Sequence, residues 1–168
     1  MTKISKKQAE VALFERFAVC YHARYGADLV DIAHGDKPDF LATDSVLGIR
    51  LGVEVTGAYQ DSREAEINYS KHVWWGALTG SAADTVTAVN HAMAKKAEKR
   101  RQYAFPGPIL LAVWIGSLVF AHESDFRLLA PRLLVPENQY SLISLILKSD
   151  SGPTLLVLQE DPKWREAA

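Results

Sequence analysis

Two carboxylates that lie fifteen positions apart, Asp39 and Glu54, could together hold a divalent metal ion. Pro38 favours an extended backbone in the residue before it, so Asp39 is expected to enter a strand from an extended turn. Glu54 lies in residues 49–55, where aliphatic side chains alternate with polar or small ones, so it points to the face opposite its apolar neighbours. A carboxylate in an otherwise apolar strand is costly to bury unless a cation pairs with it. Mg²⁺ or Mn²⁺ is a suitable partner because hard cations prefer carboxylate oxygens, and the pair therefore predicts a site for a divalent metal ion.

The residues Pro38-Asp39, followed by Glu54-Val55-Thr56, resemble the PD-(D/E)xK nuclease superfamily, and most closely a bacterial branch that reads PDF…GVEVT. The resemblance implies an α/β, restriction-endonuclease-like fold: a three-layer core with a central mixed sheet flanked by helices in the order αβββαβ. A C-terminal β-hairpin is expected to follow that core. The activity implied is metal-dependent cleavage of phosphodiester bonds by a DNA or RNA endonuclease.

The lysine of that superfamily would fall at position 56, where this chain has Thr56. In several branches the lysine has moved to a neighbouring helix. Lys96 precedes Tyr103 by two helical turns, which is the spacing found in related sequences, so Lys96 is the candidate for the displaced lysine. The alternative is a lysine whose aliphatic stem covers apolar surface while its ammonium reaches water. The predicted catalytic residues are Asp39, Glu54 and Lys96.

A third carboxylate is expected on the first helix, which a capping box at Ser5 predicts to begin there and to run to Tyr25. Glu10 falls inside the apolar face of this helix, and first-helix glutamates reach the metal in the superfamily. Glu15 is the substitute if Glu10 does not serve. The alternative is that Glu10 merely complements the positive N-terminal end of the helix. The metal ligands implied by the resemblance are Glu10, Asp39, Glu54 and the backbone carbonyl of Val55.

A second long helix, predicted from Asp84 to Tyr103 with an apolar stripe that includes Ala104, carries a basic cluster near its end. Basic side chains there suit the helix dipole. The more specific interpretation is a phosphate-contacting patch, whose binding would weaken steeply with salt. The expected partner is nucleic acid, DNA before RNA, and a homodimer is expected by analogy with nuclease relatives. The candidate nucleic-acid-binding residues are Lys95, Lys99, Arg100 and Arg101.

The other elements follow from hydrophobic pattern and from turn residues. Ile109–Ile115 is a nearly continuous apolar run, which is typical of a central strand covered on both faces. Residues 61–75 could form a helix that ends in Trp74 and Trp75, which either stack on bases or pack in the core. A short helix is predicted to begin at residue 124 or 125 and to continue toward residue 134. The remaining predicted strands are 28–33, 39–43, 50–56, 141–147 and 154–158.

Composition limits the functions that fit. A chain of 168 residues with 48% apolar side chains predicts one domain, residues 1–168, that folds without metal or disulfide support. A formal charge of −1 means that any nucleic-acid surface must be local. One cysteine, Cys20, excludes an internal disulfide, and with no leader-like or membrane-spanning run the expected location is cytoplasmic. The alternative to a nuclease is a catalytically inactive, nuclease-like binding or scaffold module, which Thr56 favours.

Overall fold

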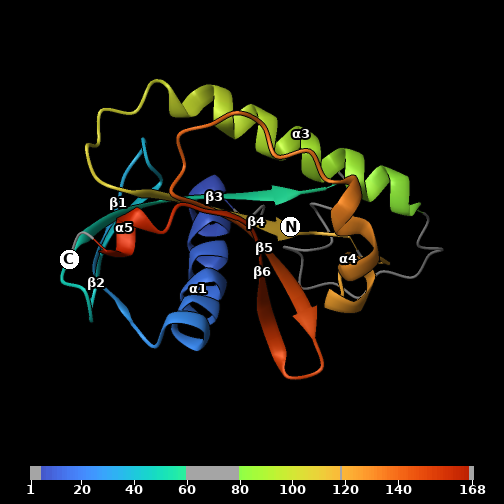
Figure 1. The fold of residues 1–168 in the computed structure, drawn as a ribbon, viewed down its shortest axis with the longest axis horizontal. Coiled ribbons are helices and arrows are strands. Elements are labelled where there is room, and N and C mark those ends of the chain that lie inside the picture. The colour runs from blue at the N-terminus through green and yellow to red at the C-terminus, as the bar shows by residue number, and fades with distance from the viewer. Residues whose placement is uncertain (1–4, 60–79, 118, 167–168) are drawn as a thin grey trace.

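The computed structural model describes residues 5–59, 80–117 and 119–166. Within these residues, six strands form one open sheet in the order β1-β2-β3-β4-β5-β6, and helices cover both of its faces (Figure 1). The prediction of an α/β fold with a central mixed sheet between helices is confirmed. The helix predicted for residues 61–75, with its two tryptophans, lies outside the described residues.

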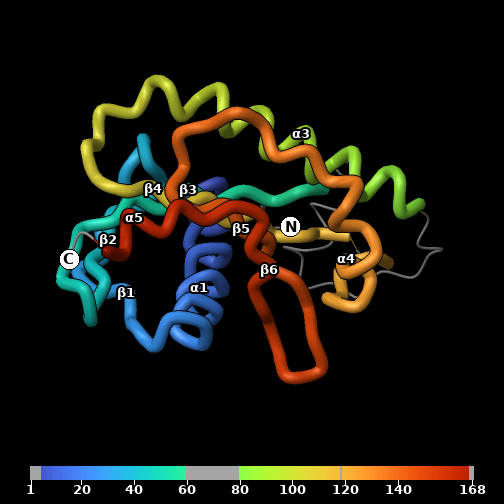
Figure 2. The backbone as a smooth tube through the Cα atoms, viewed as in Figure 1, coloured from blue at the N-terminus to red at the C-terminus, as the bar shows by residue number. Residues whose placement is uncertain are grey.

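The sheet contains both antiparallel and parallel pairs of strands. The first three strands form an antiparallel meander, the central pairs β3–β4 and β4–β5 are parallel, and β5–β6 is an antiparallel hairpin that projects from the body (Figure 2). That hairpin extends further toward its turn than the sequence pattern predicted. The strands are β1 Leu29–His34, β2 Phe40–Asp44, β3 Arg50–Ala58, β4 Ile109–Ile115, β5 Leu142–Ser149 and β6 Gly152–Glu160.

The long helices begin at side-chain caps. The box predicted at Ser5 is present at the start of the first helix, and Gly26 ends that helix with a left-handed φ of 67°. The second long helix begins earlier than predicted, because Ser81 is its N-cap, and Asp84, the third residue of the helix, completes the capping box. The helical elements are α1 Lys6–Tyr25, α3 Ala82–Arg100, α4 Glu123–Leu129, the 3₁₀ turn η1 Ala130–Arg132 and α5 Lys163–Glu166.

Helix α3 also ends earlier than predicted, and this changes where Tyr103 lies. The backbone N–H of Tyr103 donates to the carbonyl of Arg100 at 3.1 Å, a contact between residues three apart that tightens the last turn and stops the α-helix. Tyr103 therefore lies in a turn just after the helix. Ala104, predicted to belong to the buried stripe, is exposed beyond this turn.

The core consists of two apolar layers, one on each face of the sheet. Strand β4 is buried at every position, and its side chains alternate between the layers. Each large side chain that is fully buried stabilises the fold by roughly 1.5–3 kcal/mol. On one face α1 packs against the strands through Leu13, Phe14, Phe17 and Tyr21. On the other face α3 and α4 pack through Val86, Val89, Met93 and Phe126.

A buried carboxylate fixes the turn between β2 and β3. Asp44 accepts the backbone N–H groups of Val46 and Leu47, each at 2.8 Å, and the hydroxyl of Tyr21 at 2.6 Å. Burial acts to raise the pKa of Asp44, but the Tyr21 hydrogen bond and the two backbone N–H groups outweigh it and hold this pKa below its ordinary value. The hydrogen bond from Tyr21 to Asp44 therefore connects α1 to the C-terminal end of β2.

Cys20 and Trp164 are two further buried residues of the core layer beneath α1. Cys20 is buried in the layer beneath α1, and burial raises the pKa of its thiol to about 11, which suits an inert packing residue. Trp164 is buried and meets the ring of Tyr25 edge-on at 6.1 Å, so α5 docks against α1. None of the described helices has both the length and the apolar character to cross a membrane.

Candidate functional site

Asp39 and Glu54 lie side by side where the chain enters β2. The backbone N–H of Asp39 donates to Oε2 of Glu54 at 3.1 Å, and the backbone N–H of Val55 donates to Oδ2 of Asp39 at 2.9 Å. Both side chains are buried, with 5% and 2% of their surface exposed. The two acids that the sequence singles out therefore meet, and backbone groups of both segments hold them.

Strand β2 begins at Phe40, one residue later than predicted, and this start leaves room for the pair. Phe40 pairs with Val53, and β3 then continues past the point where β2 begins. Because the N–H and C=O of a strand residue point to the same edge, the carbonyl of Val55 faces the side on which its N–H meets Asp39. Two carboxylates and one carbonyl thus lie beside the part of β3 that extends past the start of β2.

A glycine permits the close approach of the segment that carries Asp39. A Cβ atom on Gly52 would lie 2.8 Å from Cγ of Pro38 and 2.9 Å from Cγ1 of Ile109. The absence of that atom lets Pro38 pack directly on β3. The residue immediately before Asp39 is thereby packed against β3.

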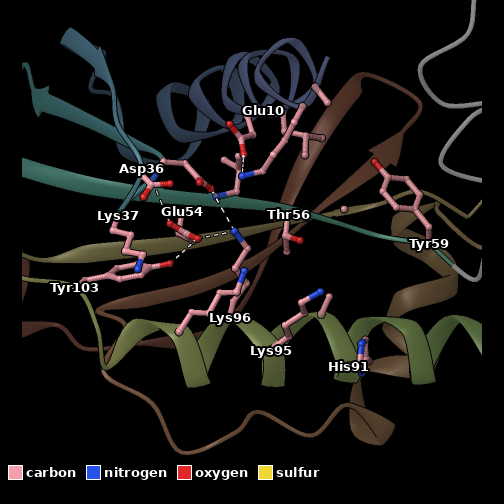
Figure 3. Close-up of a pocket in the computed structure, with 18 of the residues that line it drawn as sticks. Glu10, Asp36, Lys37, Glu54, Thr56, Tyr59, His91, Lys95, Lys96 and Tyr103 are labelled. Carbon is pink, nitrogen blue, oxygen red and sulfur yellow. Dashed lines mark hydrogen bonds and ion pairs between the residues drawn. The ribbon is translucent and has the colours of Figure 1, made fainter. Parts of the chain in front are cut away.

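Lys96 reaches both carboxylates from α3. Its ammonium bonds Oε1 of Glu54 and lies 3.3 Å from Oδ2 of Asp39 (Figure 3). The side chain is 16% exposed, and its charge is directed at the acids instead of extending into water. The lysine proposed to replace the one missing at Thr56 therefore stands beside both acids, and Thr56 lines the same pocket.

Two tyrosines complete the contacts around this group. The hydroxyl of Tyr103 donates to Oε1 of Glu54 at 2.6 Å, and the hydroxyl of Tyr140 donates to the carbonyl of Lys96 at 3.0 Å. Sequence reasoning used Tyr103 only as a spacing marker and gave Tyr140 no role. The two-turn distance from Lys96 was the signal that could have placed Tyr103 in the site, whereas no local pattern marks Tyr140.

The electrostatic balance at Asp39 favours a further cation. Burial raises the pKa of the Asp39 carboxyl above its ordinary value, and the negative charges of Glu54 and Glu10 raise it further. The ammonium of Lys96 and the N–H of Val55 lower this pKa without cancelling the rise. Acids in a cleft whose pKa values are shifted by burial and by neighbouring charges are often found at functional sites.

Glu10, the predicted third metal ligand, lines the same pocket but has other partners. One oxygen lies 3.1 Å from the ammonium of Lys6 and the other lies 3.0 Å from Nε2 of His34. The hydrogen bond to Glu10 raises the pKa of Lys6. Among residues 5–59, 80–117 and 119–166, no three His, Cys, Asp or Glu side chains are grouped so that they could hold a metal. Glu15, the predicted substitute, is exposed and lies outside the pocket lining.

The pocket has a volume of about 580 Å³ and lies between the start of α1, the edge of β3 and α3. Lys95 and Lys99, predicted to bind nucleic acid, line it. Arg100 instead places its guanidinium 5.8 Å from the centre of the Tyr103 ring, and Arg101 is exposed outside the lining. Sequence reasoning did not place three further basic residues that line the pocket, Lys6, Lys37 and His91.

Comparisons of this chain with protein families, curated proteins and solved structures give no match. The chemistry of the pocket therefore has to be inferred from its own contacts.

Proposed function

We propose that the protein is a metal-dependent nuclease that hydrolyses phosphodiester bonds, with DNA before RNA as its substrate. One observation carries this proposal. Asp39, Glu54 and Lys96 come from the entry to β2, from β3 and from α3, and their charged groups converge in one pocket. The order α1-β1-β2-β3-α3-β4 also agrees with the αβββαβ core of the PD-(D/E)xK superfamily, which supports a restriction-endonuclease-like fold.

The donor set suits Mg²⁺ or Mn²⁺. The carboxylates of Asp39 and Glu54 and the carbonyl of Val55 are all oxygen donors, and Mg²⁺ is often held by one or two carboxylates with water completing its shell. Lys96 supplies one positive charge against two buried carboxylates, so the group carries an uncompensated negative charge when both are ionised. When bound there, Mg²⁺ or Mn²⁺ would supply two kinds of chemistry: it would polarise a phosphoryl oxygen and lower the pKa of a bound water.

The residues around the acids have separate tasks in this proposal. Lys96 presents a cation that can stabilise charge as it develops on the phosphate oxygens. Lys95 and Lys99 lie on either side of Lys96 in the sequence of α3 and also line the pocket, where they can neutralise neighbouring phosphates. Asp39 and Glu54 hold the metal, and Val55 adds its carbonyl. The homodimer expected from the resemblance stays a prediction.

The test is cleavage of plasmid DNA, single-stranded DNA and RNA in the presence of Mg²⁺ or Mn²⁺. Asp39→Ala and Glu54→Ala are each expected to lower the cleavage rate by at least about 100-fold, the effect of removing a group that stabilises transition-state charge. Asp36→Ala is a matched control, because Asp36 is an exposed acid that lines the same pocket. Undiminished cleavage by both site variants would exclude the proposed site.

A second candidate function is a binding module that captures a polyanion without cleaving it. The observation in its favour is that Lys96 already bonds both carboxylates, while no three-ligand metal group forms in the part of the chain that the structure describes. Calorimetry separates the two functions. A nuclease is expected to bind Mn²⁺, with loss of binding in Glu54→Ala, whereas the module is expected to bind DNA in a salt-sensitive manner and to give no heat with Mn²⁺.

A further inference from the structure

We infer that Tyr103 is a positioning residue that fixes the orientation of the Glu54 carboxylate toward the pocket. This inference rests on the proposed function and adds a residue to it. Tyr103 acts through Glu54, so its effect is expected on metal binding and on the rate of the chemical step.

The two carboxylate oxygens of Glu54 accept hydrogen bonds from different donors. Oε2 accepts the backbone N–H of Asp39, while Oε1 accepts both the ammonium of Lys96 and the hydroxyl of Tyr103. The carboxylate cannot rotate without breaking bonds on both sides. The Tyr103 bond, at 2.6 Å, has the short O···O distance that is typical of a hydroxyl donating to an ionised carboxylate.

Tyr103 is itself held by the end of α3. Its backbone N–H donates to the carbonyl of Arg100 at 3.1 Å, and the Arg100 guanidinium lies over its ring. Lys96 lies in α3 and Tyr103 lies in the turn that ends this helix, so both groups that bond Oε1 of Glu54 come from one continuous segment. The side chain of Glu54 is thereby fixed between β3, which carries it, and α3, which orients it.

The chain contains a matched control for the loss of this hydroxyl. Tyr21 also donates to a buried carboxylate at 2.6 Å, but its partner Asp44 lies at the opposite end of β2 from Asp39. Tyr21→Phe and Tyr103→Phe therefore delete the same kind of bond at two places. A general loss of stability would appear in both variants, whereas an effect on the pocket would appear in Tyr103→Phe alone.

The experiment is titration of the full chain and its variants with Mn²⁺, followed by steady-state cleavage of DNA. Loss of a residue that orients a metal ligand typically weakens metal binding or activity by about 10–100-fold, and this range is expected for Tyr103→Phe. The kcat for DNA is expected to fall while its KM stays near the wild-type value. Tyr21→Phe is expected to bind Mn²⁺ as the wild type does. Placing 4-aminophenylalanine at position 103 restores a donor and is expected to recover most of the affinity.

The possible failures can be told apart. If the wild type neither binds Mn²⁺ nor cleaves DNA, the proposed function fails and this inference fails with it. If the wild type and Tyr21→Phe bind Mn²⁺ and Tyr103→Phe binds it equally well, the proposed function stands and Tyr103 is only a packing residue. Should Tyr103→Phe not fold, the 4-aminophenylalanine variant decides: wild-type affinity supports the inference, and loss of affinity in a folded protein overturns it.

Discussion

Replacing Lys96 with methionine is the most direct test of the electrostatic argument. The substitution keeps a long aliphatic side chain on α3 but removes the ammonium that bonds Glu54 and Asp39. Two buried carboxylates, 5% and 2% exposed, are then left without this countercharge. The protein is expected to lose stability because their charge is no longer compensated inside the fold.

The size of the effect follows from this burial. Breaking a buried ion pair by removing one partner costs about 3–5 kcal/mol of unfolding free energy. For a chain of this length a change of 1 kcal/mol moves the melting temperature by about 2–4 °C, so the expected decrease is roughly 6–20 °C. Mn²⁺ at a concentration of a hundred times its dissociation constant would raise the unfolding free energy of the variant by about 2.7 kcal/mol, because it binds the folded state.

The loss should depend on pH in a defined direction. Burial already raises the pKa of Asp39, and Lys96 is the group that lowers it most, so the variant raises this folded-state pKa further. An acid whose pKa is raised by folding destabilises the protein once it ionises, and this cost is absent below the unfolded value of about 3.9. The difference between wild type and variant should therefore be small in acid and grow as the pH rises through the folded-state pKa of Asp39.

The assay is urea unfolding at a series of pH values in buffer that contains a chelator, repeated with Mn²⁺. Lys95→Met is the matched control, because Lys95 is an exposed lysine next in sequence on α3 and should change stability by no more than about 0.5 kcal/mol. If Lys96→Met costs no more than Lys95→Met at every pH, the ammonium does not compensate the two acids and the reasoning is wrong.

Two further substitutions test the supports of the site. Gly52→Ala is expected to lower the unfolding free energy by about 1–3 kcal/mol, as measured by urea unfolding, because the added methyl group overpacks against Pro38. Displacement of Asp39 is expected to weaken Mn²⁺ binding, as measured by calorimetry. Unchanged values in both assays would show that Pro38 can move without cost. Tyr21→Phe is expected to lose about 1.5–3 kcal/mol at neutral pH, the value of a hydrogen bond to a charged group. Because the folded-state pKa of Asp44 is lowered, this loss should vanish as the pH falls through that pKa, and a loss that persists in acid would assign the Tyr21 effect to packing instead.

Local pattern was sufficient for most of the elements. The capping box at Ser5, the left-handed Gly26 and the apolar run of Ile109–Ile115 each reflect interactions between residues near in sequence, and the structure contains the elements they predict. The end of α3 was placed wrongly because the helical pattern continues past Arg100 while the backbone tightens into a turn. Tertiary contacts that hold the hydroxyl of Tyr103 against Glu54 accompany that turn.

The carboxylate pair was predictable for a similar reason. Asp39 immediately precedes β2 and Glu54 lies in β3, and antiparallel pairing of these two strands through a short turn brings such residues together. The interaction partners of Glu10 were not predictable. Its position on α1 was correct, but its partner His34 comes from the end of β1, and nothing in the helix pattern indicates that contact.

The amino-acid sequence by itself determined which faces of the helices and strands are apolar, and it placed two acids at neighbouring strand positions. The resemblance suggested Lys96 as their cation, and the tertiary structure brings the ammonium of Lys96 to both acids. Lys96 is 42 positions from Glu54 along the chain, and it arrives there because Val89 and Met93 pack α3 onto the sheet at one particular height and rotation. That placement depends on how the surface of α3 packs against the surface of the sheet, and local preferences along the chain do not determine this packing.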